Sequence, residues 1–544
     1  MEMTGAAVVA ATLAARGVGT VFGVPGGHNL PLFAAIEQAG IATVGARHEQ
    51  GAGFMAEAWS RVTGRAAVVV TTAGPGLTKT LTPIAHAAAD GAAVCVLALD
   101  NYLPTLADSR GQFHGISDMR AAVSAFADLV GCAETPAMAG ELVAQALDGM
   151  LVRPARPLVV QLPSDVLTAC AELSPAASDP APTPALDDQA ISELARMLSA
   201  AQAPILFAGA GAVRSGAHEE LARLAERLGC PVVTTVAGRG AVPDDHPLAT
   251  GPIWDRFGPR DDVAAQADLV LCVGTRLTPL ATRNGALPIG GRVAVVDLQP
   301  EEPGRRYPAR LSVAGDARQV LGRLLDDPAL PDRGGAEIKV ADEAQRAAAS
   351  WRAAFAAGAP KAHELLTALD AAVPTDTIFA CDMTVLGYWA QRFLRVRRPG
   401  GLISPYYFGT LGYGLPAALG AQVASPDATV IALCGDAGFV MNSQEMATAR
   451  HLGLPVVAVV INDGGYAAVH ADERRTKVGA LSISKITNPG FGLLAEAYGW
   501  RHQRVSADGA EVTAAVQRAV SAGAPSLVEV TLTAPLPMPY EVSW

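Results

Sequence analysis

Short, continuous apolar runs recur along the whole chain, and segments of helical length and composition separate them. Examples are "AAVVVTT", "AAVCVLALD", "PLVVQLP", "LVLCVGT", "ATVIALCGD" and "PVVAVVIND". Strands without polar alternation are buried on both faces, as in parallel sheets that helices cover on both sides. The pattern therefore predicts an α/β fold of doubly wound parallel sheets. Half of the 544 residues are apolar, which is enough to fill several such cores.

Two stretches interrupt this alternation. The segment "CAELSPAASDPAPTPALDD" (170–188) is rich in Pro, Ala and Asp, and "DDPALPDRGGAEIK" (326–339) is a weaker break of the same kind. Such compositions are typical of linkers. We predict an N-terminal domain over 1–169, a linker over 170–187, a middle domain over 188–325, a second linker over 326–359 and a C-terminal domain over 360–544.

Charge and cysteine usage restrict the partners and the compartment. The net charge of −11 argues against a nucleic-acid partner, which would need a basic face. The seven cysteines are scattered singly without metal-binding spacing, which is typical of a reducing compartment. The N-terminus carries an acid where a signal peptide needs a base, and no apolar run approaches the ~20 residues of a membrane span. We expect a cytoplasmic protein without a membrane partner. Only 17% of residues are charged, which favours an oligomer.

The stretch "CGDAGFVMN", from Cys434 to Asn442, contains an acid directly after a predicted buried strand. One helical segment further on, Asp463 follows the next strand, so Asp436 and Asp463 would meet at one sheet edge if the strands are neighbours. Two carboxylates with the backbone carbonyls of Gly464 and Gly465 form a partial shell of the kind that Mg²⁺ prefers. The alternative is that both acids cap helices.

The spacing from "GDA" to "ND" resembles the thiamin-diphosphate motif, which begins GDG and ends in NN or ND. By this resemblance Asp436, Asp463 and the carbonyl of Gly465 would hold Mg²⁺, which binds the cofactor's diphosphate. The residues that would line the diphosphate are Gly435, Asp436, Ala437, Gly438, Asp463, Gly465 and Tyr466. Two positions depart from the motif. Ala437 replaces the usual Gly, and Asp463 stands where Asn is commoner, which adds a negative charge.

The segment "RHEQGAGFMAEAWSRVTGR" resembles the one that carries this family's catalytic glutamate, which here is Glu49. The resemblance implies a water-shielded carboxylate that shares a proton with N1′ of the cofactor's pyrimidine; the alternative is a solvated surface acid. The neighbouring "FGVPGG" (22–27) and "TTAGPGLT" (71–78) match the same domain and add Pro25, Gly26 and Thr72 as cofactor contacts. In "GTLGYGLPAALGA" (409–421), Gly409 and Leu411 would support the bent cofactor.

The resemblance covers nearly the whole chain in the domain order of acetolactate synthases: pyrimidine-binding, middle, diphosphate-binding. It implies a carboligase that decarboxylates a 2-oxo acid and passes the acyl unit to an aldehyde or ketone. It also implies a homodimer or homotetramer in which Glu49 and the diphosphate site of one cofactor come from different subunits. The alternatives are a 2-oxo-acid decarboxylase, a benzaldehyde-lyase-like enzyme, and a catalytically idle regulatory paralogue. Pyruvate oxidase is disfavoured because it would need tightly bound FAD.

Several substrate-side positions depart from the synthases. His28 follows "PGG" where benzaldehyde-lyase-like enzymes place a histidine, and "GQFHGISD" brings Gln112 and His114 to the expected mouth of the site. We take these three as candidate catalytic residues; ordinary loop residues are the alternative. Ala467 and Ala468 are small where synthases carry bulkier residues, which suggests room for a substrate larger than pyruvate. The alternative is that they only reflect the high alanine content of this chain.

The middle domain contains "GAGAVRSG" (209–216), a glycine-rich turn between a strand and a helix. Its spacing differs from the dinucleotide-binding GxGxxG pattern. We interpret it as a tight turn with close packing; binding of a nucleotide phosphate is the alternative. The resemblance to acetolactate synthases, many of which hold FAD in this domain, makes FAD a possible second cofactor.

Overall fold

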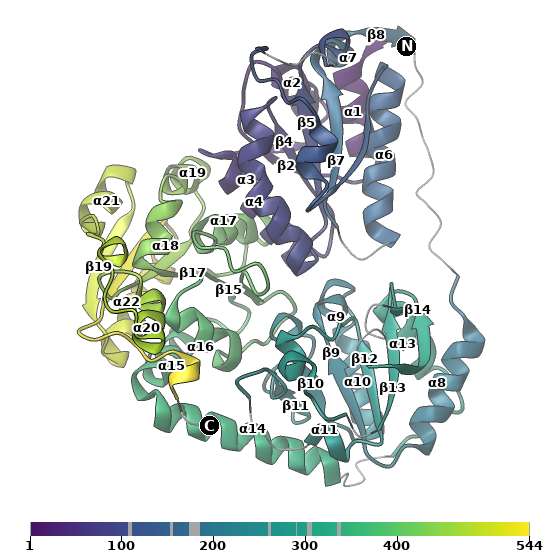
Figure 1. The fold of residues 1–544 in the computed structure, drawn as a ribbon, viewed down its shortest axis with the longest axis vertical. Coiled ribbons are helices and arrows are strands. Elements are labelled where there is room, and N and C mark those ends of the chain that lie inside the picture. Colours follow the sequence, from purple (N-terminus) through teal and green to yellow (C-terminus); the bar gives the residue numbers. More distant parts are fainter. Residues whose placement is uncertain are drawn as a thin grey trace. The chain divides into compact units, whose positions relative to one another are not determined.

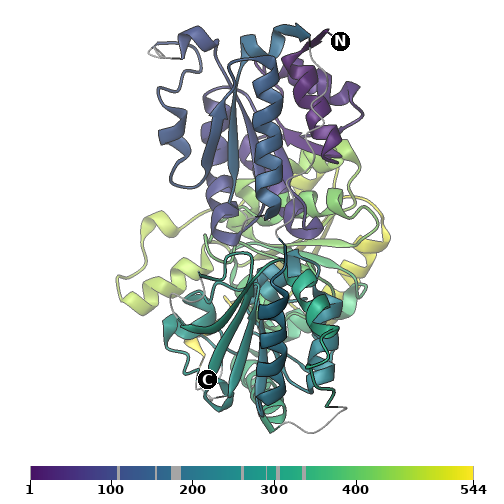
Figure 2. The same cartoon turned by 90° about the vertical axis from the view of Figure 1, so that its right-hand side faces the viewer.

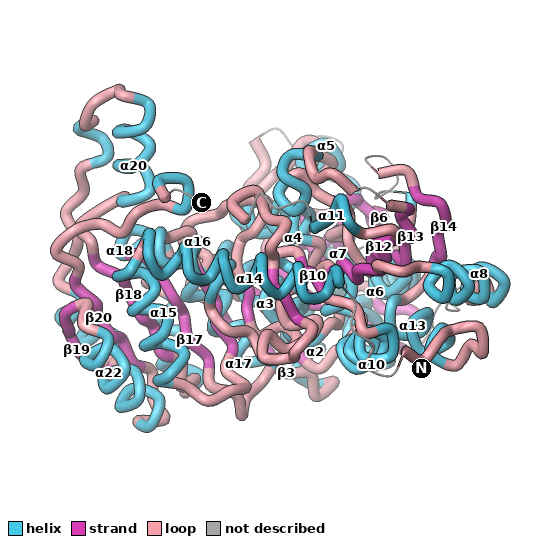
Figure 3. Tube along the Cα trace, turned by 90° about the horizontal axis from the view of Figure 1, so that it is seen from below, coloured by secondary structure: helices cyan, strands magenta, loops and turns pink. Residues whose placement is uncertain are grey.

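The structure is a computed structural model, and it describes residues 2–106, 111–152, 156–172, 185–258, 263–289, 291–301, 307–333 and 339–542. Residues 173–184 of the first predicted linker and 334–338 of the second lie outside the described residues, so the domain boundaries stay a prediction. Within the described chain, three parallel sheets of six strands each are flanked by helices (Figures 1 and 3). The predicted class, α/β with doubly wound parallel sheets, is confirmed.

The described chain divides by its contacts into two compact units. The first contains the N-terminal sheet and two segments from much later in the sequence, Tyr407–Pro426 and Asn442–Leu454. The second contains the middle and C-terminal sheets. The C-terminal third of the chain therefore contributes helices to both units.

The N-terminal sheet has the strand order β3-β2-β4-β5-β7-β6, with every neighbouring pair parallel. Its strands are β2 (Thr20–Gly23), β3 (Ala42–Gly45), β4 (Ala67–Thr71), β5 (Val94–Asp100), β6 (Asp128–Cys132) and β7 (Leu158–Pro163). A separate antiparallel pair joins β1 (Glu2–Thr4) to β8 (Cys170–Glu172).

Helices cover both faces of this sheet (Figure 1). They are α1 (Gly5–Ala15), α2 (Leu30–Gln38), α3 (Glu49–Thr63), α4 (Pro75–Asp90), α5 (Met119–Val123), α6 (Pro136–Val152) and α7 (Ser164–Thr168). Val68 and Val70 of β4 join the core beneath α1, α2 and α6. Val69, between them, is equally buried and, because side chains alternate along a strand, faces the other side. This is why the strand sequences are apolar without alternation.

Two helices from the later segments, α17 (Gly414–Ala424) and α19 (Glu445–Leu452), complete the first unit. Helix α17 packs closely along α3. At the contact, a Cβ on Gly420 would collide with the main chain of Met55. The small residues of "GAGF" and "LGA" therefore allow two helices far apart in sequence to approach backbone to backbone.

The middle sheet has the order β11-β10-β9-β12-β13-β14 and is also parallel (Figure 2). Its strands are β9 (Pro204–Ala208), β10 (Val232–Thr234), β11 (Ala249–Gly251), β12 (Leu269–Val273), β13 (Arg292–Asp297) and β14 (Ala309–Ala314). Its helices are α8 (Asp188–Ala200), α9 (Ala210–Arg214), α10 (His218–Leu228), α11 (Val263–Gln266), α13 (Ala317–Leu325) and α14 (Lys339–Gly358). Separate cores lie on its two faces.

The C-terminal sheet has the order β16-β15-β17-β18-β20-β19. Its strands are β15 (Ile378–Cys381), β16 (Leu402–Ile403), β17 (Val430–Gly435), β18 (Val457–Asn462), β19 (Arg501–Ser506) and β20 (Ser526–Thr531). Its helices in the second unit are α15 (Pro360–Ala372), α16 (Val385–Phe393), α18 (Asp436–Met441), α20 (Ala467–Thr476), α21 (Phe491–Tyr498) and α22 (Gly509–Ser521). The apolar residues of α15, α16 and α22 build one core beneath this sheet.

The N-terminal and C-terminal sheets share one topology. Numbered along the chain within each sheet, both have the order 2-1-3-4-6-5, whereas the middle sheet has 3-2-1-4-5-6. In open parallel sheets, ligands bind beyond the carboxyl ends of the strands where the order reverses. The topology therefore predicts ligand binding beyond the ends of β2 and β4 in the N-terminal sheet and of β15 and β17 in the C-terminal sheet. No helix among the described residues is long and apolar enough to cross a membrane.

Candidate active site

The loops that follow β17 and β18 bring Asp436 and Asp463 together. The two strands are parallel neighbours, with Gly435 opposite Ile461. The buried Asp436 carboxylate accepts hydrogen bonds through Oδ2 from the amides of Gly464 (2.9 Å) and Gly465 (3.0 Å). One carboxylate thus fixes the loop that carries the second.

Asp463 has the electrostatic character of a cation ligand. Its Oδ1 atom is buried and has no hydrogen-bond partner within the described residues. Burial, and then the charge of Asp436, raise the pKa of Asp463 to about 7. A divalent cation would offset the repulsion between two adjacent carboxylates and would bind the unpaired buried oxygen. Oxygen atoms are the ligands that Mg²⁺ and Ca²⁺ prefer. The residues therefore fit a metal that would anchor a diphosphate.

The other predicted diphosphate residues surround this pair. Gly435 ends β17, and Ala437 lies in α18, where its amide donates to Asp436 Oδ1 (2.7 Å) and where alanine is a favourable residue. A Cβ on Gly438 would approach the carboxylate of Asp382 to 3.1 Å. Tyr466 is half-buried and precedes the first residue of α20.

Two members of this cluster were not predicted from the sequence. Asn488 donates from Nδ2 to Asp436 Oδ2 (2.7 Å) and to Asn462 Oδ1 (3.3 Å). Asp382 directly follows β15, on the other side of the strand-order reversal, and is buried. A polar residue after the strand "IFAC" was the available signal for Asp382, whereas Asn488 lies in a loop with no pattern to mark it.

Glu49 is the first residue of α3 in the first unit, and it is buried rather than solvated. His48 caps the helix by accepting a hydrogen bond from the amide of Gln50 (3.1 Å). The Glu49 carboxylate lies 3.3 Å from the ammonium group of Lys79, at the start of α4. This chain therefore places a cation beside the predicted catalytic acid.

Glu445 of α19 fixes the backbone just before Glu49. Its fully buried carboxylate accepts from the amides of His48 (3.1 Å) and Arg47 (3.2 Å) and from the Thr448 hydroxyl (2.7 Å). Burial raises the pKa of Glu445 above its ordinary value. No local sequence pattern indicates this contact, because the partners are almost 400 positions apart.

The turn after β2 is held by a buried side chain, Asn29. It accepts from the amide of Gly26 (2.7 Å) and donates to the carbonyl of Val24 (3.0 Å). Pro25 is exposed in this turn, and a Cβ on Gly26 would approach Thr72 Oγ1 to 3.1 Å. The predicted Gly26 and Thr72 therefore meet where β2 and β4 end.

His28 and His114 also meet in this region. His28 Nδ1 lies 3.4 Å from Thr72 Oγ1, and the two imidazole rings are 5.3 Å apart. Phe113, largely exposed, stacks on His114 at 3.9 Å. Burial, and then the charge of His28, lower the pKa of His114. His114 has a left-handed backbone with φ of 61°, which is strained for a residue with a Cβ.

The remaining predicted residues of the first unit show different environments. Gln112 donates from Nε2 to the carbonyl of Thr105 (3.2 Å), and residues 107–110 between them lie outside the described chain. Gly409 has φ of 72°, a conformation that favours glycine. Leu411 is 38% exposed. An exposed apolar side chain fits a residue that a ligand covers.

The structure also describes the surroundings of Ala467 and Ala468 and of the glycine-rich turn in the middle domain. Ala467 is buried in the core beneath the C-terminal sheet and Ala468 is partly buried against that core, and the larger substrate pocket stays a prediction. In the middle domain, Gly209 and Gly211 donate their amides to the carbonyls of Val273 (2.9 Å) and Gly274 (2.8 Å). Side chains there would collide with the loop after β12. The turn is thus closely packed, as interpreted, and those two amides are already engaged.

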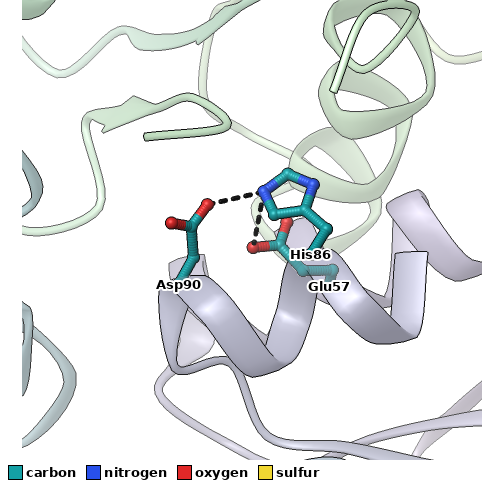
Figure 4. Close-up of side chains that lie close together, drawn as sticks. All are labelled: Glu57, His86 and Asp90. Carbon is teal, nitrogen blue, oxygen red and sulfur yellow. Dashed lines mark ion pairs between the residues drawn. The ribbon is translucent and has the colours of Figure 1, made fainter. Parts of the chain in front are cut away.

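A second group of titratable residues, also missed by the sequence analysis, lies inside the first unit. Glu57, His86 and Asp90 are buried and close together (Figure 4). His86 Nε2 is 2.6 Å from Asp90 Oδ2, and Arg61 Nη1 is 3.3 Å from Glu57 Oε1. The Tyr413 hydroxyl donates to Glu57 Oε2 (2.6 Å). The cation Arg61 and the short His86–Asp90 contact mark a buried charge network that joins α3, α4 and α17 rather than a metal site.

Family models of three domains match this chain. They are the N-terminal TPP binding domain (residues 3–121), the central domain (191–324) and the C-terminal TPP binding domain (382–530) of thiamine pyrophosphate enzymes. The chain therefore belongs to the thiamin-diphosphate (thiamine pyrophosphate) enzyme family. It is an enzyme that acts on carbon–carbon bonds with thiamin diphosphate, as the sequence resemblance predicted.

Its relatives include both decarboxylases and synthases. A probable 2-ketoarginine decarboxylase of Pseudomonas aeruginosa is 36% identical over 495 residues, which cover 90% of this chain and 87% of the relative. Acetolactate synthase isozyme 2 large subunit of Escherichia coli is 29% identical over 97% of this chain and 96% of its own. The solved structure of a Rhodococcus jostii thiamin-diphosphate-dependent 4-hydroxybenzoylformate decarboxylase has a similar fold, with a TM-score of 0.83 and 24% identity over 98% of this chain and 99% of that chain.

Proposed function

We propose that this enzyme decarboxylates a 2-oxo acid with thiamin diphosphate and Mg²⁺, and that protonation followed by aldehyde release is its main outcome. The observation that carries the cofactor assignment is the buried, unpartnered Oδ1 of Asp463 beside Asp436. The decarboxylase outcome is supported by the paired imidazoles of His28 and His114, and by the 36% identity to a decarboxylase.

Each half of the machinery has a defined task. Asp436, Asp463 and the carbonyl of Gly465 would hold Mg²⁺, and the adjoining loop residues Gly435, Ala437, Gly438 and Tyr466 would hold the diphosphate. Pro25, Gly26, Thr72, Gly409 and Leu411 would contact the organic part of the cofactor. When bound, thiamin diphosphate supplies the carbon nucleophile and the electron sink for decarboxylation. Glu49 would hold or move the proton at N1′ of the pyrimidine.

The histidine pair would supply protons at the substrate end. A histidine near its neutral state can donate or accept a proton around physiological pH. Because burial lowers the pKa of His114, its neutral imidazole, which can accept a proton, persists to lower pH. Gln112, on the same loop as His114, would orient the substrate. Protonation of the substrate-derived carbon at this point would release an aldehyde.

Carboligation is the second candidate, and the synthase relatives favour it. In this case a second carbonyl compound, an aldehyde or a ketone, would take the acyl unit before a proton does. The product would be a 2-hydroxyketone or a 2-hydroxy-3-oxo acid. FAD forms no part of the proposal; a flavin absorption spectrum of the purified protein would show it directly.

We also propose that the active form is a homodimer or homotetramer. Glu49 of one copy would then serve the Asp436 and Asp463 site of another, as the family resemblance implies. Closed symmetric assemblies are the usual form of such oligomers.

Proton NMR of the holoenzyme with single 2-oxo acids, and then with an added aldehyde, tests the proposal. We expect consumption of the 2-oxo acid and an aldehyde signal, with little hydroxyketone even when acceptor is present. Hydroxyketone as the main product would move the assignment to carboligation. No consumption of any 2-oxo acid, with cofactor bound, would favour an idle paralogue.

A further inference from the structure

A cavity of about 500 Å³ in the second unit is lined by an excess of arginines. Two loops of the middle domain contribute Arg256, Phe257 and Arg283. Helix α20 contributes Asp472 and Arg475, and the last turn of the chain contributes Tyr540. None of these residues belongs to the cofactor machinery described above.

The single carboxylate in this lining is already engaged. Asp472 Oδ1 accepts from the Tyr540 hydroxyl (2.8 Å) and from Arg475 Nε (3.0 Å). The Tyr540 hydrogen bond is the main reason that the pKa of Asp472 lies below its ordinary value. Asp472 therefore stays ionised. Asp472 and Arg475 therefore neutralise each other, and Arg256 adds a positive charge to the lining.

Arg256 supplies the charge that is not neutralised. Its guanidinium lies 4.4 Å from the ring of Phe257, and no carboxylate of the described chain pairs with it. The same ring is contacted from 4.9 Å by Arg392, which forms a buried ion pair with Asp255 (3.0 Å). The loop that carries Arg256 is thus anchored by a buried salt bridge, which keeps the guanidinium in place at the cavity.

The second loop is held in an unusual conformation at the same cavity. Arg283 and Asn284, in the turn Leu280–Gly285, have left-handed backbones with φ of 53° and 60°. The carbonyl of Leu280 accepts from the amide of Arg256 (3.3 Å), which ties the two loops together. Backbone strain of this kind persists at sites where the surrounding structure imposes it.

Helix α20 connects the cavity to the loop of the predicted metal site. Helix α20 begins two residues after Gly465, and Asp472 and Arg475 are its sixth and ninth residues. At about 1.5 Å per residue, their backbones lie roughly 8–12 Å along the helix from its start. Long arginine side chains can cover part of that span, so a substrate of a few carbons bridges the rest.

We propose that this cavity binds a second anionic group of the substrate, so that the enzyme acts on 2-oxo acids that carry a carboxylate or phosphate at the far end of the chain. The inference rests on the proposed decarboxylase function and specifies its substrate class. A cationic chain end such as a guanidinium would meet like charge here. Planar bidentate recognition by arginine suits an oxyanion.

Three 2-oxo acids of similar length test the charge preference. The holoenzyme is given 2-oxoadipate (anionic end), 2-oxohexanoate (neutral end) and 5-guanidino-2-oxopentanoate (cationic end). We expect kcat/KM at least tenfold higher for 2-oxoadipate than for either of the others. Equal values for the anionic and neutral acids, or a preference for the cationic one, would overturn the inference while leaving decarboxylation intact.

Arg256→Gln isolates the residue. Loss of one charge-assisted hydrogen bond should lower kcat/KM for 2-oxoadipate about ten- to hundredfold, chiefly through KM, and change the value for 2-oxohexanoate little. Arg474→Gln is the matched control, because Arg474 lies on the same helix but pairs with Glu541 outside the cavity lining. An equal loss in both variants would contradict the assignment.

A binding measurement separates this inference from the proposed function. Calorimetric titration of the holoenzyme with glutarate needs no turnover. Binding that Arg256→Gln weakens at least tenfold and Arg474→Gln preserves would support the cavity even if no 2-oxo acid were consumed. Absence of glutarate binding, together with turnover of 2-oxohexanoate, would leave the function standing and remove the anion site.

Discussion

At the scale of single residues, Glu49 shows how position decides chemistry. Most glutamates are solvated, but this one is buried at the first position of α3 with its carboxylate 3.3 Å from Lys79. Its amide neighbours are held by Glu445, so the backbone that aims Glu49 has little freedom. A buried, rigidly mounted carboxylate is suited to proton exchange at a fixed atom of a ligand.

Glu49→Gln should therefore abolish proton transfer without removing the side chain's volume. We expect thiamin diphosphate to bind with little change, and turnover of the best 2-oxo acid to fall about 10²- to 10⁴-fold. Calorimetric titration of the cofactor and steady-state kinetics measure the two effects. Near-normal turnover in this variant would show that Glu49 is not the proton-exchanging acid.

At the scale of elements, α19 acts on the start of α3 through one carboxylate. Glu445 accepts three hydrogen bonds, two of them from the backbone just before Glu49. Burial opposes ionisation of this carboxylate, and the hydrogen bonds offset only part of that cost. The position of Glu49 therefore depends on the correct folding of α19, which lies almost 400 residues away in the sequence.

The stability of the protein should depend on pH through Glu445. Its folded pKa is raised above the ordinary value of 4.5, so the unfolded chain loses this proton first as the pH rises. The contribution of Glu445 to stability is thus greatest below pH 4.5 and declines as the pH rises through the folded pKa. The Glu445→Gln variant has no titratable group at this position. The difference in melting temperature between the natural protein and this variant should therefore decrease between pH 4 and pH 8. A difference that increases with pH would contradict this.

Close helix contact provides a second test at this scale. Gly420→Ala would place a Cβ against the main chain of Met55, and overpacking of this kind typically costs about 1–3 kcal/mol. Gly322→Ala is the matched control, since Gly322 lies within α13 with open space around its added Cβ. This control should gain about 0.5–1 kcal/mol because alanine is the better helix former. Thermal unfolding of both variants should show shifts of opposite sign.

At the scale of the whole molecule, the machinery is distributed over two compact units of one chain. The first holds Glu49, His28 and His114, and the second holds Asp436 and Asp463. If Glu49 and the metal site around one cofactor come from different copies, as proposed, then two copies inactivated at different residues can together form one complete site. This distinguishes a shared site from a site within one chain.

Mixing two inactive variants, Glu49→Gln and Asp436→Asn, tests the shared site. Random reassembly makes half of the dimers mixed, and each mixed dimer would have one of its two sites fully native, so activity should recover to about a quarter of the natural level. The mixture must first be dissociated and reassembled, and each variant treated alone is the control. If both groups came from one chain, no mixed dimer would contain a complete site and no activity would return.

Much of the local structure could be predicted from the sequence because its causes are local. The apolar runs that became β4, β5, β17 and β18 are buried on both faces, and this follows from composition alone. The ends of predicted buried strands marked Asp436 and Asp463, and the family resemblance pointed to Gly26 and Thr72. The resemblance of these motifs to the thiamin-diphosphate family implied the cofactor, whereas strand geometry alone indicated only that Asp436 and Asp463 would share one sheet edge.

Other features were decided only by tertiary structure, because they join residues that no local pattern connects. Asn488 reaches Asp436 from a loop, Glu445 reaches the backbone at His48, and Arg256 faces α20 across a cavity. Ala467 lies in the core beneath the C-terminal sheet and Ala468 packs against that core, which the sequence pattern did not indicate. Sequence periodicity reports which face of an element is buried, whereas the neighbour that buries it depends on how the whole chain packs. The sequence by itself thus determined the fold class and the cofactor, and the packed structure alone decided what surrounds the reacting groups.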